Sequence, residues 1–242
     1  MTKVTPYEHS TDSKRKQVEK MFDNISDNYD FLNRSLSFGI DIWWRKKMLG
    51  KLKGIEINRL LDIATGTGDV AIAASKQLNP KSIIGVDISD GMLAVGRVKI
   101  EKKGLSQIIE LQNADSENLP FESNSFDAVT VAFGVRNFEH LSIGLQEMNR
   151  VLRPGGKVVI LEFSRPRIFP IRQLYDFYFR YFCPWWGKLI SKDNSAYRYL
   201  YESVSVFPEG DEFLTIAKNS GFKDLQAQRV TFGIVSLYTG IK

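Results

Sequence analysis

The stretch LLDIATGTGDVA, residues 60–71, joins an apolar run to a glycine turn and to the start of a helical pattern. Gly66, Gly68 and Ala71 satisfy the pattern G-x-G-x-x-G/A, and Asp87 follows 19 residues after Gly68. Backbone N–H groups at a helix start can face a polar ligand, and a carboxylate after the next strand can accept hydrogen bonds from a ribose diol. The stretch therefore predicts a nucleotide-type cofactor at a strand-to-helix turn.

Short runs rich in Val and Ile, separated by helical patterns, surround this turn. They occupy residues 59–66, 82–89, 108–115, 126–134 and 157–163. Near-continuous apolar strands that alternate with helices indicate a parallel sheet covered on both faces. Two further strand-like runs, residues 222–231 and 233–241, can pair as an antiparallel hairpin at the sheet edge. We predict an α/β, Rossmann-like fold: a doubly wound, mostly parallel seven-stranded sheet with a C-terminal antiparallel hairpin.

The length of 242 residues suits one large domain, and 43% apolar with 25% charged residues is an ordinary globular composition. We expect residues 1–13 to form a mobile arm and residues 14–242 to form a single domain. Apolar residues recur at helical spacing from Val18 to Leu32, and residues 14–57 are predicted to be an N-terminal helical cover. Residues 164–200 are predicted to be an aromatic insertion.

The net charge and the cysteine count limit the cellular location and the binding partners that we expect. A net charge of +5 suits an anionic ligand, a membrane surface or RNA, without choosing among them. The longest stretch without a charged residue, 230–241, is shorter than the ~20 residues of a spanning helix. Cys183 is the only cysteine and the N-terminus has no apolar signal region, so we expect a cytoplasmic location. The basic runs SKRK and WRKK are short, and we expect no nucleic-acid partner.

Acidic residues near the strand ends favour S-adenosylmethionine over NAD. Asp62 precedes the turn, where a carboxylate suits an amino or sulfonium group and would repel a pyrophosphate. Asp115, with Ser116 beside it, ends the third run and can accept a hydrogen bond from an adenine amine. The turn alone leaves an NAD-dependent oxidoreductase open, and Asp62 can instead be a helix cap. A binding module for RNA or protein, suggested only by the charge, is a third class.

From about Val18 to Lys242 the sequence resembles the menaquinone/ubiquinone-biosynthesis C-methyltransferases, within the class I S-adenosylmethionine-dependent methyltransferases. The resemblance rests on family-specific blocks: MFDNISDNYDFLNRSLSFGIDIWW, ATGTGD, ENLPFESNSFD, AFGVRN, LRPGGKVVILEFSRP and AYRYLYESVSVFP. Two positions depart from it, since Ala132 stands where the family often has Ser and Thr65 where some members have Gly.

The resemblance implies S-adenosylmethionine as the cofactor and no metal. Its contacts carry over to the following positions: Gly66, Thr67, Gly68, Asp87, Asp115 and Ser116. The implied reaction methylates a ring carbon of a prenylated hydroquinone, with demethylmenaquinol favoured. The benzoquinol precursor of ubiquinone, or another small aromatic acceptor, stays an alternative.

Such a reaction must help a phenol with a pKa of roughly 10 to ionise. Arg136 and Asn137, at the end of the fourth strand, are the candidate catalytic residues. Because arginine stays protonated, we expect Arg136 to stabilise a phenolate or to position a water; a structural salt bridge is the alternative. His140 is expected at a helix start or on the surface, and Tyr29 with Asp30 to cover the cofactor.

The aromatic run YDFYFRYFCPWW, residues 175–186, holds eight aromatic side chains. A wall of this kind can shelter an isoprenoid tail or lie at the lipid interface. The alternative is an extra helix that covers the sheet. We therefore expect that the protein can contact the inner face of the membrane peripherally. Homo-oligomer formation is a further possibility to test.

Overall fold

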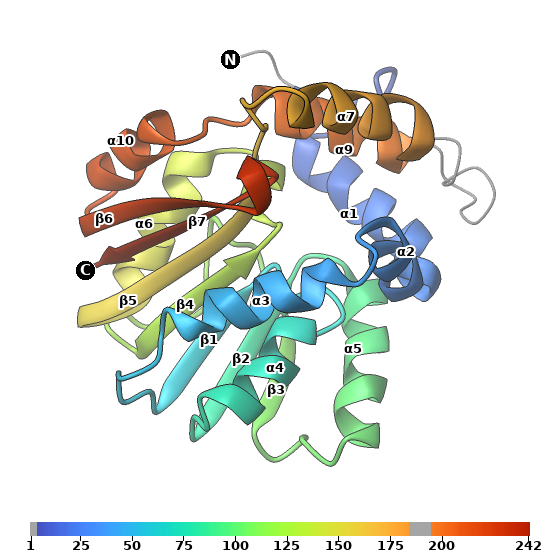
Figure 1. Cartoon of the computed structure of the whole chain (residues 1–242). Helices are drawn as coiled ribbons and strands as arrows, with labels where there is room; N and C mark the ends of the chain where they lie inside the picture. The colour runs from blue at the N-terminus through green and yellow to red at the C-terminus, as the bar shows by residue number, and fades with distance from the viewer. Residues whose placement is uncertain (1–3, 184–194) are drawn as a thin grey trace.

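Seven strands form one mixed sheet in residues 4–183 and 195–242, the part of the chain that the computed structural model describes (Figure 1). Their order is β3-β2-β1-β4-β5-β7-β6. The neighbouring pairs among β1 to β5 are parallel, whereas β7 is antiparallel to β5 and to β6. The predicted mostly parallel sheet with a C-terminal antiparallel hairpin is thus confirmed. The strands are β1 (Arg59–Ile63), β2 (Ser82–Asp87), β3 (Ile109–Asn113), β4 (Phe126–Ala132), β5 (Leu152–Phe163), β6 (Lys223–Val230) and β7 (Val235–Ile241).

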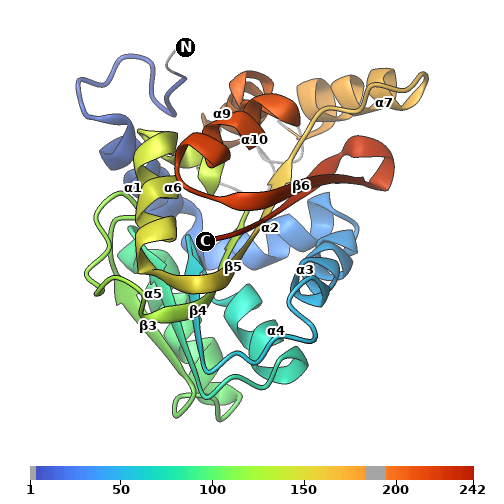
Figure 2. The same ribbon diagram turned by 90° about the vertical axis from the view of Figure 1, so that its left-hand side faces the viewer.

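Two layers of helices cover the sheet. One face packs against α3 (Ile40–Gly50), α4 (Asp69–Gln77) and α5 (Asp90–Lys102). The other packs against α6 (Leu141–Val151) and α10 (Asp211–Asn219). Figure 2 shows α3 and α4 on the opposite side of the strands from α6. Both faces of the central strands are buried, which explains their continuous apolar sequences.

Four more helices gather beyond the carboxyl ends of the parallel strands (Figure 1). They are α1 (Lys14–Ile25), α2 (Tyr29–Leu36), α7 (Ile171–Phe177) and α9 (Ser195–Val206). The single amphipathic helix predicted over Val18–Leu32 is two helices, because a 3-10 turn at Ser26–Asn28 separates α1 from α2. The Ser26 hydroxyl donates to the Asp23 carbonyl, a local bond that competes with a continuous helix.

The structure describes most of the predicted N-terminal arm and part of the predicted aromatic insertion. Val4 and Tyr7 of the predicted arm pack against an apolar cluster to which α1, α5 and α9 contribute, and the Tyr7 N–H donates to Gln17. The aromatic run forms α7 and a π-helical turn, η3 (Tyr178–Phe182), while its last residues, 184–186, lie outside the described residues. Within the described ranges, no helix is long and apolar enough to cross a membrane.

Candidate cofactor and acceptor site

The glycine turn between β1 and α4 is fixed by the end of β2. Gly66 and Gly68 have φ of +55° and +78°, a left-handed conformation that favours glycine. The Gly66 N–H donates to Oδ2 of Asp87 at 2.8 Å, and the Ser89 N–H donates to Oδ1 at 3.0 Å. The carboxylate of Asp87 is therefore held beside the turn, as its spacing in the sequence predicts.

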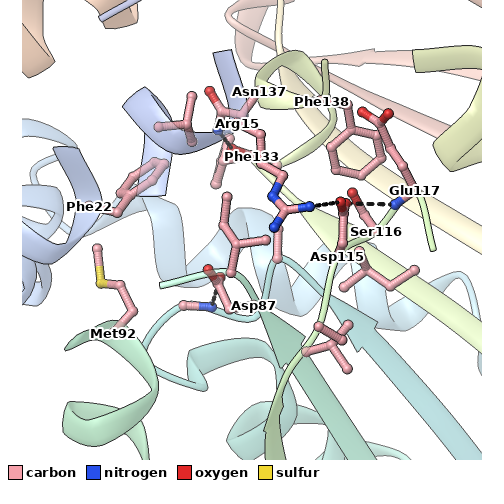
Figure 3. Close-up of a pocket in the computed structure, with 18 of the residues that line it drawn as sticks. Arg15, Phe22, Asp87, Met92, Asp115, Ser116, Glu117, Phe133, Asn137 and Phe138 are labelled. Atoms are coloured by element: carbon pink, nitrogen blue, oxygen red, sulfur yellow. Dashed lines mark hydrogen bonds and ion pairs between the residues drawn. The ribbon is translucent and has the colours of Figure 1, made fainter. Parts of the chain in front are cut away.

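A pocket lies next to this turn, and we call it the polar pocket (Figure 3). Five of the predicted site residues line it: Gly66, Asp87, Asp115, Ser116 and Asn137. Apolar side chains complete its walls, including Phe22, Met92 and Phe133.

Thr67 and Gly68 are not among the residues that line the polar pocket. The Thr67 hydroxyl donates to Asp30 Oδ1 at 2.6 Å and accepts from Lys99 Nζ at 3.0 Å. Thr67 thus bonds to α2 and α5. A direct cofactor contact by its side chain stays a prediction, and the structure gives the hydroxyl another partner.

Asp62 lies beneath the turn and does not line the polar pocket either. Its side chain is buried, and the hydroxyls of Thr65 and Thr130 donate to its two carboxylate oxygens at 2.6 and 2.7 Å. Burial raises the pKa of Asp62 to about 6, although both hydroxyls oppose the shift. In this structure the acid braces the turn from below.

Asp115 is covered by a residue that the sequence analysis missed. Arg15 of α1 forms an ion pair with Oδ2 of Asp115 at 2.8 Å, while Oδ1 accepts from the Glu117 N–H (Figure 3). A hundred residues separate Arg15 from Asp115, and no local pattern marks such a pair. The helix α1 therefore covers the end of the pocket that contains Asp115 and Ser116.

A polar network ties α2 to the glycine turn. Lys99 Nζ lies 2.5 Å from Asp30 Oδ2 and 2.7 Å from Asp69 Oδ1. Arg34 extends the network through an ion pair of 2.9 Å with Asp69. Through Lys99, Asp30 attaches α2 to the first turn of α4, and its role in covering the cofactor stays a prediction.

A second and larger cavity lies beside the polar pocket, and we call it the apolar cavity. It encloses about 990 Å³, within the range of sites that hold small organic ligands. It shares three walls with the polar pocket: Phe22, Tyr29 and Phe133. Helices α2, α3, α7 and α9 supply much of the lining, including Leu32, Leu36, Trp44, Leu174, Tyr175, Phe177, Tyr199 and Leu200.

The two candidate catalytic residues belong to different cavities. Both lie on the 3-10 turn η2 (Val135–Asn137) after β4, where Asn137 lines the polar pocket and Arg136 lines the apolar cavity. Gly134 precedes them, and a Cβ there would lie 2.5 Å from the Cβ of Ala64. Only glycine permits this close approach of η2 to the end of β1.

Arg136 forms the salt bridge that we set against a catalytic role. Its Nη1 lies 2.7 Å from Oε1 of Glu162, which is fully buried. The Nε of Arg136 is also buried and has no hydrogen-bond partner among the described residues, as is the case for Oδ1 of Asn137. The guanidinium is therefore anchored by one nitrogen and keeps another for a ligand.

His140 supplies no base to either cavity. It begins α6, and its Nδ1 lies 2.8 Å from a Glu117 oxygen at the surface, which confirms the expected helix-start position.

A family model described as the "ubiE/COQ5 methyltransferase family" matches residues 10–242.

Curated relatives match almost the whole chain. A demethylmenaquinone methyltransferase of Bacteroides fragilis is 49% identical over 99% of this chain and 98% of its own length. A ubiquinone/menaquinone biosynthesis C-methyltransferase of Geotalea daltonii is 47% identical over 95% of this chain and 97% of its own.

Solved structures share the fold at low identity. A phosphoethanolamine N-methyltransferase of Haemonchus contortus in complex with S-adenosyl-L-methionine is 18% identical, with a TM-score of 0.62 over 88% of this chain and 59% of that one. A S-adenosylmethionine-dependent methyltransferase of Thermotoga maritima is 18% identical, with a TM-score of 0.61 over 92% of this chain and 99% of that one. These likenesses support the class I methyltransferase fold.

The raised pKa of Asp62 predicts a pH-dependent stability. Its folded pKa of about 6 exceeds the ordinary 3.8, so the folded state is favoured by protonation below pH ~4, and this contribution is lost as pH rises through 6. Two pKa units correspond to about 3 kcal/mol. We expect Asp62→Asn to gain free energy of unfolding relative to the wild type between pH 4 and pH 7, measured by urea unfolding. A difference that does not change with pH would contradict this.

Proposed function

The chain belongs to the ubiE/COQ5 methyltransferase family, and we propose that it transfers the methyl group of S-adenosylmethionine to a ring carbon of demethylmenaquinol, giving menaquinol. The observation that carries the proposal is the shared wall of the two cavities. A polar pocket with nucleoside-binding groups meets an apolar cavity at Phe22, Tyr29 and Phe133. That arrangement suits a polar methyl donor and an apolar aromatic acceptor.

S-adenosylmethionine is the cofactor of this family of methyltransferases, which decides the choice against NAD that the glycine turn left open. The residues fit it. Both Asp87 oxygens accept backbone bonds, and a carboxylate has about four acceptor sites, so Asp87 can still accept from a ribose hydroxyl. Asp115 and Ser116 line the same pocket, which supports a role for them in binding the adenine, and the unpartnered Oδ1 of Asn137 can accept from a donor of the cofactor. When bound, the cofactor supplies an electrophilic methyl group on a sulfonium ion.

Arg136 is the residue we propose to favour ionisation of the acceptor. A ring carbon of a hydroquinone becomes more nucleophilic when a neighbouring phenol loses its proton. The buried guanidinium stabilises the resulting phenolate, and its Nε is a buried donor without a hydrogen-bond partner among the described residues. Glu162 orients the group and offsets part of its charge.

The cover and the insertion have separate roles in this proposal. Residues 14–57 cover the polar pocket through Arg15, and Asp30 attaches them to the glycine turn. The described parts of the insertion, residues 164–183 and 195–200, contribute walls of the apolar cavity for the isoprenoid tail. The proposed acceptor is a quinone-type molecule that lives in the bilayer, so we also propose peripheral contact with the membrane.

The mouth of the apolar cavity carries exposed apolar side chains, which we call the apolar rim: Phe38, Leu174, Phe177 and Phe232. Their exposed fractions are 82%, 62%, 63% and 67%. Exposed apolar side chains gathered around one cavity are typical of an interaction site. The rim supports entry of the acceptor from a lipid surface.

Methyl transfer from labelled S-adenosylmethionine to chemically reduced demethylmenaquinone tests the proposal. We expect product from the quinol and none from the oxidised quinone, because only the quinol can form a phenolate. Asp87→Asn, which removes the charge that binds the ribose, should weaken S-adenosylhomocysteine binding about tenfold or more. Clear cofactor binding without formation of methylated quinol would contradict the assignment of demethylmenaquinol as the acceptor. The same assay with the benzoquinol precursor of ubiquinone as the acceptor then tests the alternative substrate.

Arg136→Lys tests the role of the arginine. Lysine keeps the buried charge beside Glu162 but lacks Nε, so we expect kcat to fall at least about tenfold while S-adenosylhomocysteine affinity is unchanged. Arg136→Gln would leave the Glu162 carboxylate buried and unpaired, and loss of its fold is the expected outcome. Full turnover by the folded lysine variant would remove Arg136 from the mechanism.

Flotation with liposomes tests the membrane contact. Phe38→Asp combined with Phe177→Asp should reduce vesicle binding at least about tenfold, because each phenylalanine contributes apolar area to the interface. Ile143→Asp, an exposed position on α6, is the matched control and should bind as the wild type does. Equal binding by the rim variant and the control, or no binding by the wild type, would count against contact through the rim.

A further inference from the structure

Three buried polar atoms that belong to residues lining the apolar cavity have no partner among the described residues. They are the hydroxyls of Tyr175 and Tyr199 and the Nε of Arg136, none of which has a hydrogen-bond partner among the described residues. Tyr175 is 6% exposed, Tyr199 2%, and the Arg136 side chain 8%. All three residues line the apolar cavity.

Such a grouping points to a ligand. Buried polar groups in proteins are nearly always hydrogen-bonded, because leaving a donor unpaired loses its hydration without compensation. The other described walls of this cavity are mostly apolar, so the residues with unpartnered donors differ from most of its lining. A molecule with an oxygen-bearing head and an apolar body would match both parts.

The three residues come from elements that meet. Tyr175 lies on α7, Tyr199 on α9 and Arg136 on η2, and α9 packs against both η2 and the π-helical turn that follows α7. Burial raises the pKa of both tyrosines, while the positive charge of Arg136 opposes the shift at each. The two hydroxyls therefore lie within electrostatic reach of one guanidinium and remain protonated donors at neutral pH.

We propose that Tyr175 and Tyr199 bind the oxygen atoms of the hydroquinone ring and position it beside Arg136. This inference rests on the proposed function and adds the residues that recognise the acceptor. The ring carries two oxygens on opposite carbons, and donors from two helices can hold it in one orientation. The apolar walls then receive the hydrocarbon part of the molecule.

The assignment makes the site selective for ring oxygens. A site with buried donors discriminates strongly against an analogue that lacks the matching polar group, since the donors are then left unpaired in the complex. Tail-less probes isolate this effect from burial of the isoprenoid chain. The pair 1,4-dihydroxynaphthalene and 1,4-dimethylnaphthalene differs only by hydroxyl and methyl groups of similar size.

Titration calorimetry under reducing conditions measures the preference for the diol over the dimethyl compound. We expect the wild type to prefer the diol at least about tenfold. Tyr175→Phe and Tyr199→Phe should each reduce that preference by a factor on the order of five to ten, because each removes one donor and little volume. The same variants should lower kcat/KM for demethylmenaquinol and leave S-adenosylhomocysteine affinity unchanged.

Tyr238→Phe is the matched control. This tyrosine is also buried, but it lies on β7 and its oxygen accepts the Gly210 N–H at 3.0 Å. Its loss should lower the unfolding temperature and leave the diol preference intact. The cavity variants should show the opposite pattern, because their hydroxyls bond to no described residue of the protein.

An unchanged diol preference in both cavity variants would overturn the inference, as would a loss of stability matching that of Tyr238→Phe. The outcome is separable from the proposed function. If the wild type does not methylate demethylmenaquinol, the acceptor is wrong. A diol preference that still depends on Tyr175 and Tyr199 would then keep their role as donors to an oxygenated aromatic ring.

Discussion

The hydrogen bond from the Gly66 N–H to Asp87 is the contact on which the site depends. It joins the turn after β1 to the end of β2, and the parallel register of these strands brings the two residues to one edge. Gly66 adopts the left-handed backbone that turns its N–H toward the carboxylate. A helix starting elsewhere, or a sheet slipped by one residue, would separate Gly66 from Asp87 and disrupt the proposed cofactor site.

The two cavities are kept apart by a small number of backbone constraints. Gly134 brings η2 against the end of β1, so that consecutive side chains, Arg136 and Asn137, belong to different cavities. Phe133 forms part of the wall between them. Polar groups for a charged cofactor and apolar surface for a hydrocarbon acceptor can thus adjoin without mixing, which suits a group transfer between molecules of opposite polarity.

Local patterns predicted the sheet, the glycine turn and the positions of Asp87 and Asp115, because each depends on residues close in the chain or on parallel strands ending at one edge. Arg15 and Lys99 could not be found this way, since their partners lie distant in sequence. The hydroxyls of Tyr175 and Tyr199 were hidden for another reason. In an aromatic-rich segment a tyrosine is counted as apolar, and only its surroundings reveal whether its oxygen is satisfied.

The order in which the chain is synthesised runs against the order in which the site can form. Helices α1 and α2 leave the ribosome before any strand, yet α1 packs against Ala196 and Tyr199 of α9. The strand β7 is the last of all and inserts between β5 and β6. Until α9 has been made, the cover has no α9 to pack against, and until β7 arrives, β5 presents an unpaired edge. A nascent chain can therefore complete its glycine turn long before it can enclose an acceptor.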